Sequence, residues 1–297
     1  MSSRTRTPAA LEPYLRLPPK TSLTLLTGTL GNSAHWLLAR FAGSLLTRQP
    51  TAPHDEPLGV QAPEATVVLV SWLRDLAFWT AELRRSGGAD AASLMREGKF
   101  AFVDCFTTLP SPSEGNAMAE MEKRITSALH DITPAQKSRP TVLLLDNPDV
   151  LLALGLCTAP RLSALLLRLR SRVHATILSC AADSPLLSAA AAVTSEAAEP
   201  HVTPLEAEAA AFVVQQAHAA RVVMGMRGLE TGAAGDVSGV LRVTRGGGAY
   251  DMEMADEAED EVLGGMQDMD EVPEMEALYL VQRDGSVKVF ERGASAT

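Results

Sequence analysis

The stretch SLTLLTGTLGNSAHWLLARFAGSLL, residues 22–46, consists of an apolar segment typical of a strand, a glycine-bearing turn and a helix. This is the layout of a phosphate-binding loop, where the pattern G-x-x-x-x-G-K-[ST] aims backbone N–H groups and a lysine at phosphates while a hydroxyl holds magnesium. Counted from Gly28, Ser33 replaces the second glycine. Ala34 stands in place of the lysine and His35 in place of the hydroxyl. The sequence therefore predicts the place of a nucleotide site without its phosphate-binding and magnesium-binding side chains.

A second nucleotide-site signature is TVLLLD, residues 141–146, which predicts a buried strand that ends in a carboxylate. In nucleotide-hydrolysing proteins a carboxylate at this point reaches the magnesium shell. Aspartate before Asn-Pro is also common in turns that end a strand, so a purely structural role for Asp146 stays open. Under the first interpretation a vestigial pocket is formed by Gly28, Gly31, Asn32, Ser33, His35 and Asp146.

The composition indicates an intracellular protein without a metal site. Three cysteines are odd in number and form no C-x-x-C pair, which favours neither a disulfide framework nor a zinc site. No run of about 18 uncharged apolar residues appears, and the polar start lacks the apolar core of a secretory signal. We expect a cytoplasmic and nuclear location and no contact with a membrane.

The net charge of −10 comes from one segment. Residues 251–276 carry 12 acidic side chains and no lysine or arginine, so the remainder holds 26 basic against 24 acidic groups. Such a block repels itself and offers little apolar surface to bury, which predicts a disordered insertion at residues 250–276. The alternative is an acidic surface that attracts basic partners.

Periodicity along the chain predicts an α/β fold. Strands expected at residues 66–72, 99–106, 141–148 and 175–181 alternate with helical patterns, and apolar residues on both strand faces favour a parallel sheet covered on each side. Strands near 221–227 and 239–244 and a hairpin around Asp284-Gly285 then predict antiparallel pairing. We expect a RecA-like three-layer core with a mainly parallel sheet, antiparallel C-terminal strands and a degenerate P-loop. Residues 1–20 are interpreted as a tail or strap and 21–297 as one domain.

Local signals refine this layout. Asn32 and Ser33 are candidate caps for a helix over His35–Leu46, and Asp75 is one for the helix after the second strand. Residues 184–204 are rich in small side chains and predict a loop. A helix N-terminus lowers the pKa of a nearby imidazole, which favours a neutral packing or capping role for His35 over catalysis.

Three arginines, Arg161, Arg168 and Arg172, line one edge of a helix expected at residues 160–173. A basic stripe of this kind is able to follow a phosphate backbone, and we treat it as a candidate RNA-binding surface. Arginines that flank a buried helix face are more often solvated or paired, and that alternative stays open.

Five runs, taken in order, carry a resemblance to a known family. They are VLVSWLRDLAFWTAELRRSGGAD, GKFAFVDCFTTL, TVLLLDNPDVLLAL, MRGLETGAAGDVSGVLRVTRGGG and ALYLVQRDGSVKVFERG. Their order and spacing within an α/β layout resemble fungal members of the Elongator complex protein 6 family, over residues 21–293.

The resemblance implies a RecA-like subunit that forms a heterohexameric ring with Elongator proteins 4 and 5, two copies of each. Such a ring is an accessory module of the catalytic Elongator core, which modifies the wobble uridine of certain tRNAs. The resemblance also implies that the assembled ring binds tRNA and hydrolyses ATP to release it. We expect no cofactor in the chain alone, with ATP possible at ring interfaces.

Three parts of an ATPase are unmatched in the sequence. Besides the lysine and the magnesium hydroxyl, the carboxylate that orients the attacking water after the second strand is absent between Ser71 and Arg74. We therefore expect no catalytic residue and no enzyme activity from the chain by itself. Two alternatives stay open: a divergent RecA-like ATPase, and an α/β scaffold for protein partners that never contacts RNA.

Overall fold

A single mixed sheet organises the computed structural model, which describes residues 7–47, 65–109, 117–132, 139–192, 202–232, 234–249 and 273–291. Across the described residues the sheet has nine strands in the order β3-β2-β4-β5-β1-β6-β7-β8-β9. The first six in this order pair in parallel, and the last three are antiparallel to their neighbours. The sequence-based expectation of a mainly parallel α/β sheet extended by antiparallel strands is confirmed.

The strands and helices have the following bounds. The strands are β1 Leu23–Gly28, β2 Thr66–Ser71, β3 Phe100–Asp104, β4 Thr141–Asp146, β5 Ala175–Ala181, β6 Val222–Arg227, β7 Gly239–Arg245, β8 Met275–Val281 and β9 Val287–Glu291. The helices are η2 Ala9–Leu11, α1 His35–Leu46, α2 Leu76–Gly87, α3 Ala91–Arg96, α4 Ala117–Ile132, α5 Val150–Ala153, α6 Ala159–Arg170, α7 Ser184–Ala192 and α8 Pro204–Ala219.

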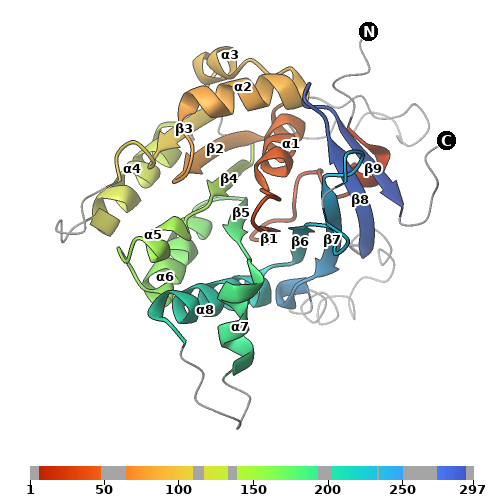
Figure 1. The fold of residues 1–297 in the computed structure, drawn as a ribbon. Coiled ribbons are helices and arrows are strands. Elements are labelled where there is room, and N and C mark those ends of the chain that lie inside the picture. Colours follow the sequence, from red (N-terminus) through yellow and green to blue (C-terminus); the bar gives the residue numbers. More distant parts are fainter. Residues whose placement is uncertain are drawn as a thin grey trace, which may run out of the picture.

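Helices cover both faces of the sheet (Figure 1). Alternate residues of each central strand point to opposite faces, so Val67 and Leu69 pack with α1 to α3 while Val68 packs with α4 to α6 and α8. Side chains on both faces are buried, which explains why the strands are apolar throughout rather than alternating. Helix α1 is enclosed almost completely, because α2, the N-terminal segment and the C-terminal strands surround it.

The N-terminal segment belongs to the domain. Leu11 and Leu15 lie in the core beside α1, and the Tyr14 hydroxyl donates to the Pro273 carbonyl at 2.7 Å. Residues 7–20 therefore pack against the rest of the domain through Leu11, Tyr14 and Leu15. The expected acidic insertion at 250–276 falls, up to residue 272, outside the described residues.

Two local expectations were wrong. Residues 184–192 form α7 and not a loop, because alanine has the highest helix propensity and this segment contains a run of it. Asn32 and Ser33 do not cap α1, whose N-cap is Ala34 without a side-chain hydrogen bond. The cap of α2 was predicted correctly, since the Asp75 carboxylate accepts from the Phe78 N–H at 2.8 Å.

Candidate functional site

The loop between β1 and α1 is a tight turn that depends on two glycines. A Cβ added at Gly28 would lie 2.6 Å from the Asn32 carbonyl oxygen, closer than real Cβ contacts allow. Gly31 has φ +83°, in the left-handed region that favours glycine. The Asn32 N–H closes the turn by donating to the Thr29 carbonyl at 2.8 Å. The two glycines in this stretch thus serve the backbone path of the loop.

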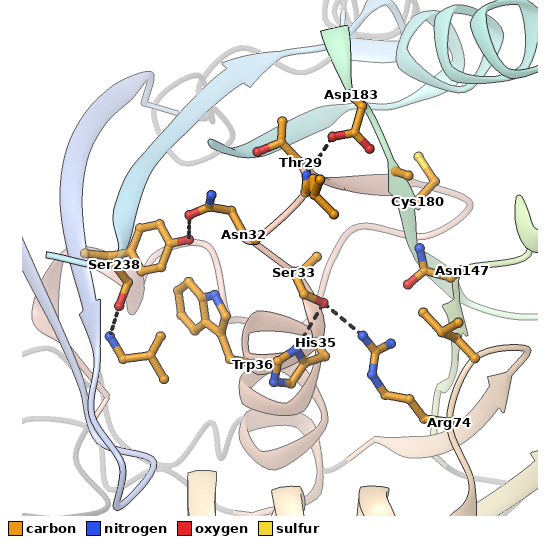
Figure 2. Close-up of a pocket in the computed structure, with 18 residues that line it drawn as sticks. Thr29, Asn32, Ser33, His35, Trp36, Arg74, Asn147, Cys180, Asp183 and Ser238 are labelled. Atoms are coloured by element: carbon orange, nitrogen blue, oxygen red, sulfur yellow. Dashed lines mark hydrogen bonds between the residues drawn. The ribbon is translucent and has the colours of Figure 1, made fainter. Parts of the chain in front are cut away.

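The loop borders a cavity of about 500 Å³, which we call the loop pocket. This volume lies in the range of small-molecule sites. Its walls come from the loop and α1, from the ends of β2, β4 and β5, and from β7 and β8 (Figure 2). The lining residues include Gly28, Gly31, Asn32, Ser33, His35, Trp36, Arg74, Asn147, Cys180, Asp183, Ser238 and Tyr279.

Arg74 connects the end of β4 to the loop. Its Nη1 donates to both carboxylate oxygens of Asp146, at 2.8 and 3.0 Å, and its Nη2 donates to Ser33 Oγ at 2.9 Å. The Arg74 side chain is 15% exposed and that of Asp146 is fully buried. Because β2 and β4 are parallel neighbours with Ser71 opposite Asp146, the turn after β2 places Arg74 over that carboxylate. The guanidinium therefore occupies the space between the loop hydroxyl and the acid.

The remaining hydrogen-bonding capacity of Asp146 is also used. Ser71 Oγ donates to Asp146 Oδ2 at 2.7 Å, and Ser179 Oγ lies 3.4 Å from Oδ1. Burial raises the pKa of the Asp146 carboxyl, and the charge of Arg74 opposes this rise. A carboxylate with this set of partners is closed to a further cation unless Arg74 leaves.

His35 is neutral at neutral pH. Burial lowers its pKa to about 4, and the nearby positive charges of Arg74 and Arg85 act in the same direction. Its Nδ1 lies 3.0 Å from Ser33 Oγ, and its ring packs edge-on against Phe78 at 5.5 Å. The neutral packing role expected from the sequence fits this geometry, although burial and two arginines are the main causes rather than the helix N-terminus alone.

An acidic side chain approaches the loop from the other side. The Leu30 N–H donates to Asp183 Oδ1 at 2.6 Å, and Asp183 follows β5, the strand paired with β1 (Figure 2). A short N–H···O⁻ contact of this kind is typical of charge-assisted bonds. The carboxylate lies against the loop backbone, where a phosphate-binding loop would present donors to an anion.

A second acid, the half-buried Asp149, contacts the lining of the pocket. Asn147, which lines the pocket, has φ +53°, and its Nδ2 donates to Asp149 Oδ1 at 3.3 Å. The other oxygen of Asp149 accepts from the Ala181 N–H at 3.0 Å. Burial raises the Asp149 pKa to about 6. This acid has hydrogen bonds from neutral donors where Asp146 has an arginine.

The wall formed by the C-terminal strands is aromatic. Trp36 of α1 stacks on Tyr279 of β8, with ring centroids 5.1 Å apart. The Asn32 amide lies 3.1 Å from the Tyr279 hydroxyl, and in the orientation that satisfies its neighbours it donates to the Ser238 carbonyl at 2.8 Å. Burial raises the Tyr279 pKa to about 12, so the hydroxyl stays protonated. The loop is thus fixed to β7 and β8 as well as to β4.

Of the residues expected in the vestigial pocket, five line the cavity and one does not. Gly28, Gly31, Asn32, Ser33 and His35 are lining residues, whereas Asp146 reaches the loop only through Arg74. No local sequence signal predicted Asp183 or Tyr279 at this site. Arg74 could have been noticed from the sequence, because it is a cation shortly after the second strand, where an ATPase carries an acid.

The three arginines of the stripe differ in position and in partners. Arg161 and Arg168 lie on α6, and Arg172 lies beyond its end. Arg168 forms a two-pronged ion pair with Glu122 of α4, at 2.8 and 2.7 Å, as the structural alternative anticipated. The stripe lies with α4 and α6 on one face of the sheet, whereas α1 and the residues that pack with it lie on the other.

Large apolar side chains are exposed where parallel strands end. Leu30 follows β1 and is 91% exposed, Leu73 follows β2, Phe106 follows β3, and Leu154 follows α5 beyond β4. Because the carboxyl ends of parallel strands meet at one edge of a sheet, Leu30, Leu73 and Phe106 share that edge, and we call them the apolar edge. Grouped exposed apolar side chains are typical of surfaces that bind a partner.

Comparisons with known proteins add no relative: no family model matches the chain, and no curated protein matches it significantly. Within the described ranges, no helix is both long and apolar enough to span a membrane. The same part of the chain holds no group of three or more His, Cys, Asp or Glu side chains arranged for a metal ion.

Proposed function

We propose that this chain is a non-catalytic, RecA-like subunit of the Elongator accessory ring and assembles with Elongator proteins 4 and 5. The resemblance of the five sequence runs supports the identity of the ring. The Arg74–Asp146–Ser33 network is the observation that carries the non-catalytic part, because a guanidinium fills the place that a nucleotide-bound magnesium ion would need.

The topology supports a RecA-like core. The loop follows β1, Asp146 ends β4, and a single strand, β5, separates them in a parallel arrangement. The loop and the carboxylate therefore lie at the same edge of the sheet, as a nucleotide site of this class requires. The side chains at that edge do not fit magnesium and triphosphate, since no lysine is present on the loop and Asp146 is already paired.

The apolar edge supports an assembly role. RecA-like rings pack one subunit against the nucleotide face of the next, and a head-to-tail contact of this kind closes a ring. An exposed Leu30 at the tip of the loop and a half-exposed Leu73, which both line the loop pocket, would be buried by such a neighbour. The surface of the former site is then kept as an interface after its chemistry has been lost.

Native mass spectrometry of the chain alone and co-expressed with Elongator proteins 4 and 5 tests the assembly. We expect a defined six-membered ring only in the co-expressed sample. Leu30→Ser with Leu73→Ser should weaken the ring, whereas Leu167→Ser, a control at a 66% exposed leucine of α6, should not. A stable ring formed by this chain alone would contradict the proposal.

Catalysis and RNA contact need separate tests. The purified chain should hydrolyse no ATP, and magnesium-dependent hydrolysis would favour the divergent ATPase, for which Asp146→Ala should then abolish activity.

For the ring, Arg161→Glu with Arg172→Glu should reduce tRNA affinity and its salt dependence, with Arg96→Glu on α3 as the control. Unchanged affinity would favour a protein scaffold whose arginine stripe does not contact RNA, a view that the Arg168–Glu122 pair supports.

A further inference from the structure

We propose that the loop between β1 and α1 carries its own ionic ligand, with Asp183 in the place of a phosphate and Arg74 in the place of the divalent cation. The proposal rests on the proposed function in treating the loop as a former nucleotide site. It goes further in assigning the protein's own side chains as the groups that keep nucleotide and metal out and hold the loop in shape.

The anionic half is the Asp183 carboxylate. Its Oδ1 accepts the Leu30 N–H at 2.6 Å, a bond that joins residues 153 positions apart in sequence. A phosphate entering the loop pocket would have to displace this carboxylate from the backbone or lie beside it. Two negative groups a few ångströms apart repel each other strongly when partly removed from water. Asp183 thus works against the ligand that the loop would otherwise favour.

The cationic half is the Arg74 guanidinium. It donates to the Asp146 carboxylate and to Ser33 Oγ. Carboxylate and hydroxyl oxygens are also the ligands that a hard divalent cation prefers. A guanidinium keeps its charge at every accessible pH and presents its N–H groups in a planar fork, so it satisfies acid and hydroxyl together. A metal ion would have to expel a cation that is covalently part of the chain.

The two halves act on the same short segment from opposite sides. Figure 2 shows Arg74 pointing at Ser33 and Asp183 reaching the loop beyond it. Asn32 is held to β7 and β8 at the same time. The loop therefore has a charged partner for its backbone and another for its hydroxyl without any added ligand. Its stability should be independent of magnesium and phosphate, because neither binds the native state.

The anionic half is tested with Asp183→Asn and inorganic pyrophosphate. Asparagine keeps an oxygen for the Leu30 N–H and removes only the charge, so the variant should fold. By calorimetric titration we expect at least about tenfold tighter pyrophosphate binding than wild type, as removal of one nearby like charge predicts. Asp131→Asn, which removes an exposed acid of α4, is the matched control and should change nothing.

The cationic half is tested with Arg74→Ala and MnCl₂. Thermal unfolding of wild type should not respond to Mn²⁺, whereas the variant should gain a Mn²⁺-dependent rise in midpoint. Adding Asp146→Asn should abolish that gain, because the carboxylate that would bind the ion is then neutral. If Arg74→Ala does not fold, the wild-type titrations with MnCl₂, pyrophosphate and their mixture still decide the question.

Wild-type binding of pyrophosphate or Mn²⁺ as tight as in the variants would overturn the proposal. Identical behaviour of wild type and Asp183→Asn would also overturn it. Neither result would affect assembly with Elongator proteins 4 and 5. Conversely, failure of that assembly would overturn the proposed function and leave the titrations as they stand.

Discussion

Two arginine–carboxylate pairs of the same chemistry lie in opposite surroundings. Arg168 binds Glu122 through two short hydrogen bonds, with side chains 54% and 26% exposed, and Arg74 binds Asp146 through bonds of similar length with side chains 15% and 0% exposed. The pKa of Glu122 is lowered by its hydrogen bond from Arg168, whereas burial raises that of Asp146 despite Arg74. The direction of each pKa shift therefore follows the burial of the acid and not the length of its hydrogen bonds to arginine.

The largest expected effect comes from breaking the buried pair. Asp146→Asn should lower the free energy of unfolding by about 3–5 kcal/mol, because the Arg74 charge is left with no acid. Urea denaturation measures this. Pairing the change with Arg74→Met should recover a large part of the loss, since no unpaired charge remains. Equal losses in the single and double variants would contradict an ion pair of this importance.

The pH dependence of Asp149 sharpens the comparison, because this half-buried acid accepts its hydrogen bonds from the neutral donors Asn147 and Ala181. The pKa of Asp149 is about 6 in the folded state, above its value in the unfolded state. Its contribution to the free energy of unfolding is therefore fully present below about pH 4 and is lost as pH rises through 6. This contribution is about 3 kcal/mol, because the pKa is raised by about 2. Urea denaturation from pH 4 to 7 should show a flatter profile for Asp149→Asn than for wild type, and parallel profiles would refute the assignment.

Removal of a supporting hydroxyl should have a smaller effect. Ser71 Oγ donates to Asp146 at 2.7 Å and accepts from the Arg74 N–H at 2.9 Å. Ser71→Ala should cost about 1–2 kcal/mol in chemical denaturation, as expected for a hydrogen bond to a charged group. Ser188→Ala on α7, where the hydroxyl is exposed, is the control, and a comparable loss there would remove the distinction.

The exposed pair should matter least. Arg168→Ala should change the free energy of unfolding by about 0–1 kcal/mol, because solvent and salt screen the two charges. The same double-mutant cycle applied to Arg168 and Glu122 should give a coupling energy well below that of Arg74 and Asp146. A larger coupling energy for the exposed pair than for the buried pair would contradict the conclusion that burial strengthens the interaction.

The parts of the fold that depend on local pattern were predictable. The bounds of α1 and β5 agree with the sequence-based ones, since each is an apolar run ended by a clear change in residue type. α7 was missed because its alanines give no amphipathic period, although they favour a helix. The small residues of this segment predicted a loop, although alanine favours a helix.

The ionic contacts of the site were beyond local reasoning. Arg74 meets Asp146 because β2 and β4 are neighbours, and that adjacency joins residues 72 positions apart. Asp183 reaches the loop because β5 pairs with β1, whereas Tyr279 reaches it from β8, three strands further along the sheet. Sequence spacing located the loop correctly, but the strand order decides which charges meet there.

The wall of the loop pocket has a consequence for biosynthesis. Trp36 finds its stacking partner in Tyr279, and Arg40, buried in α1, donates to the Gly285 carbonyl at 2.7 Å. A ribosome releases the first five strands long before it has made the hairpin, so during translation the Trp36 indole stays exposed to water and the Arg40 guanidinium lacks its native partner. Premature stop codons after β7 should therefore yield polypeptides that depend on chaperones and are cleared by proteolysis.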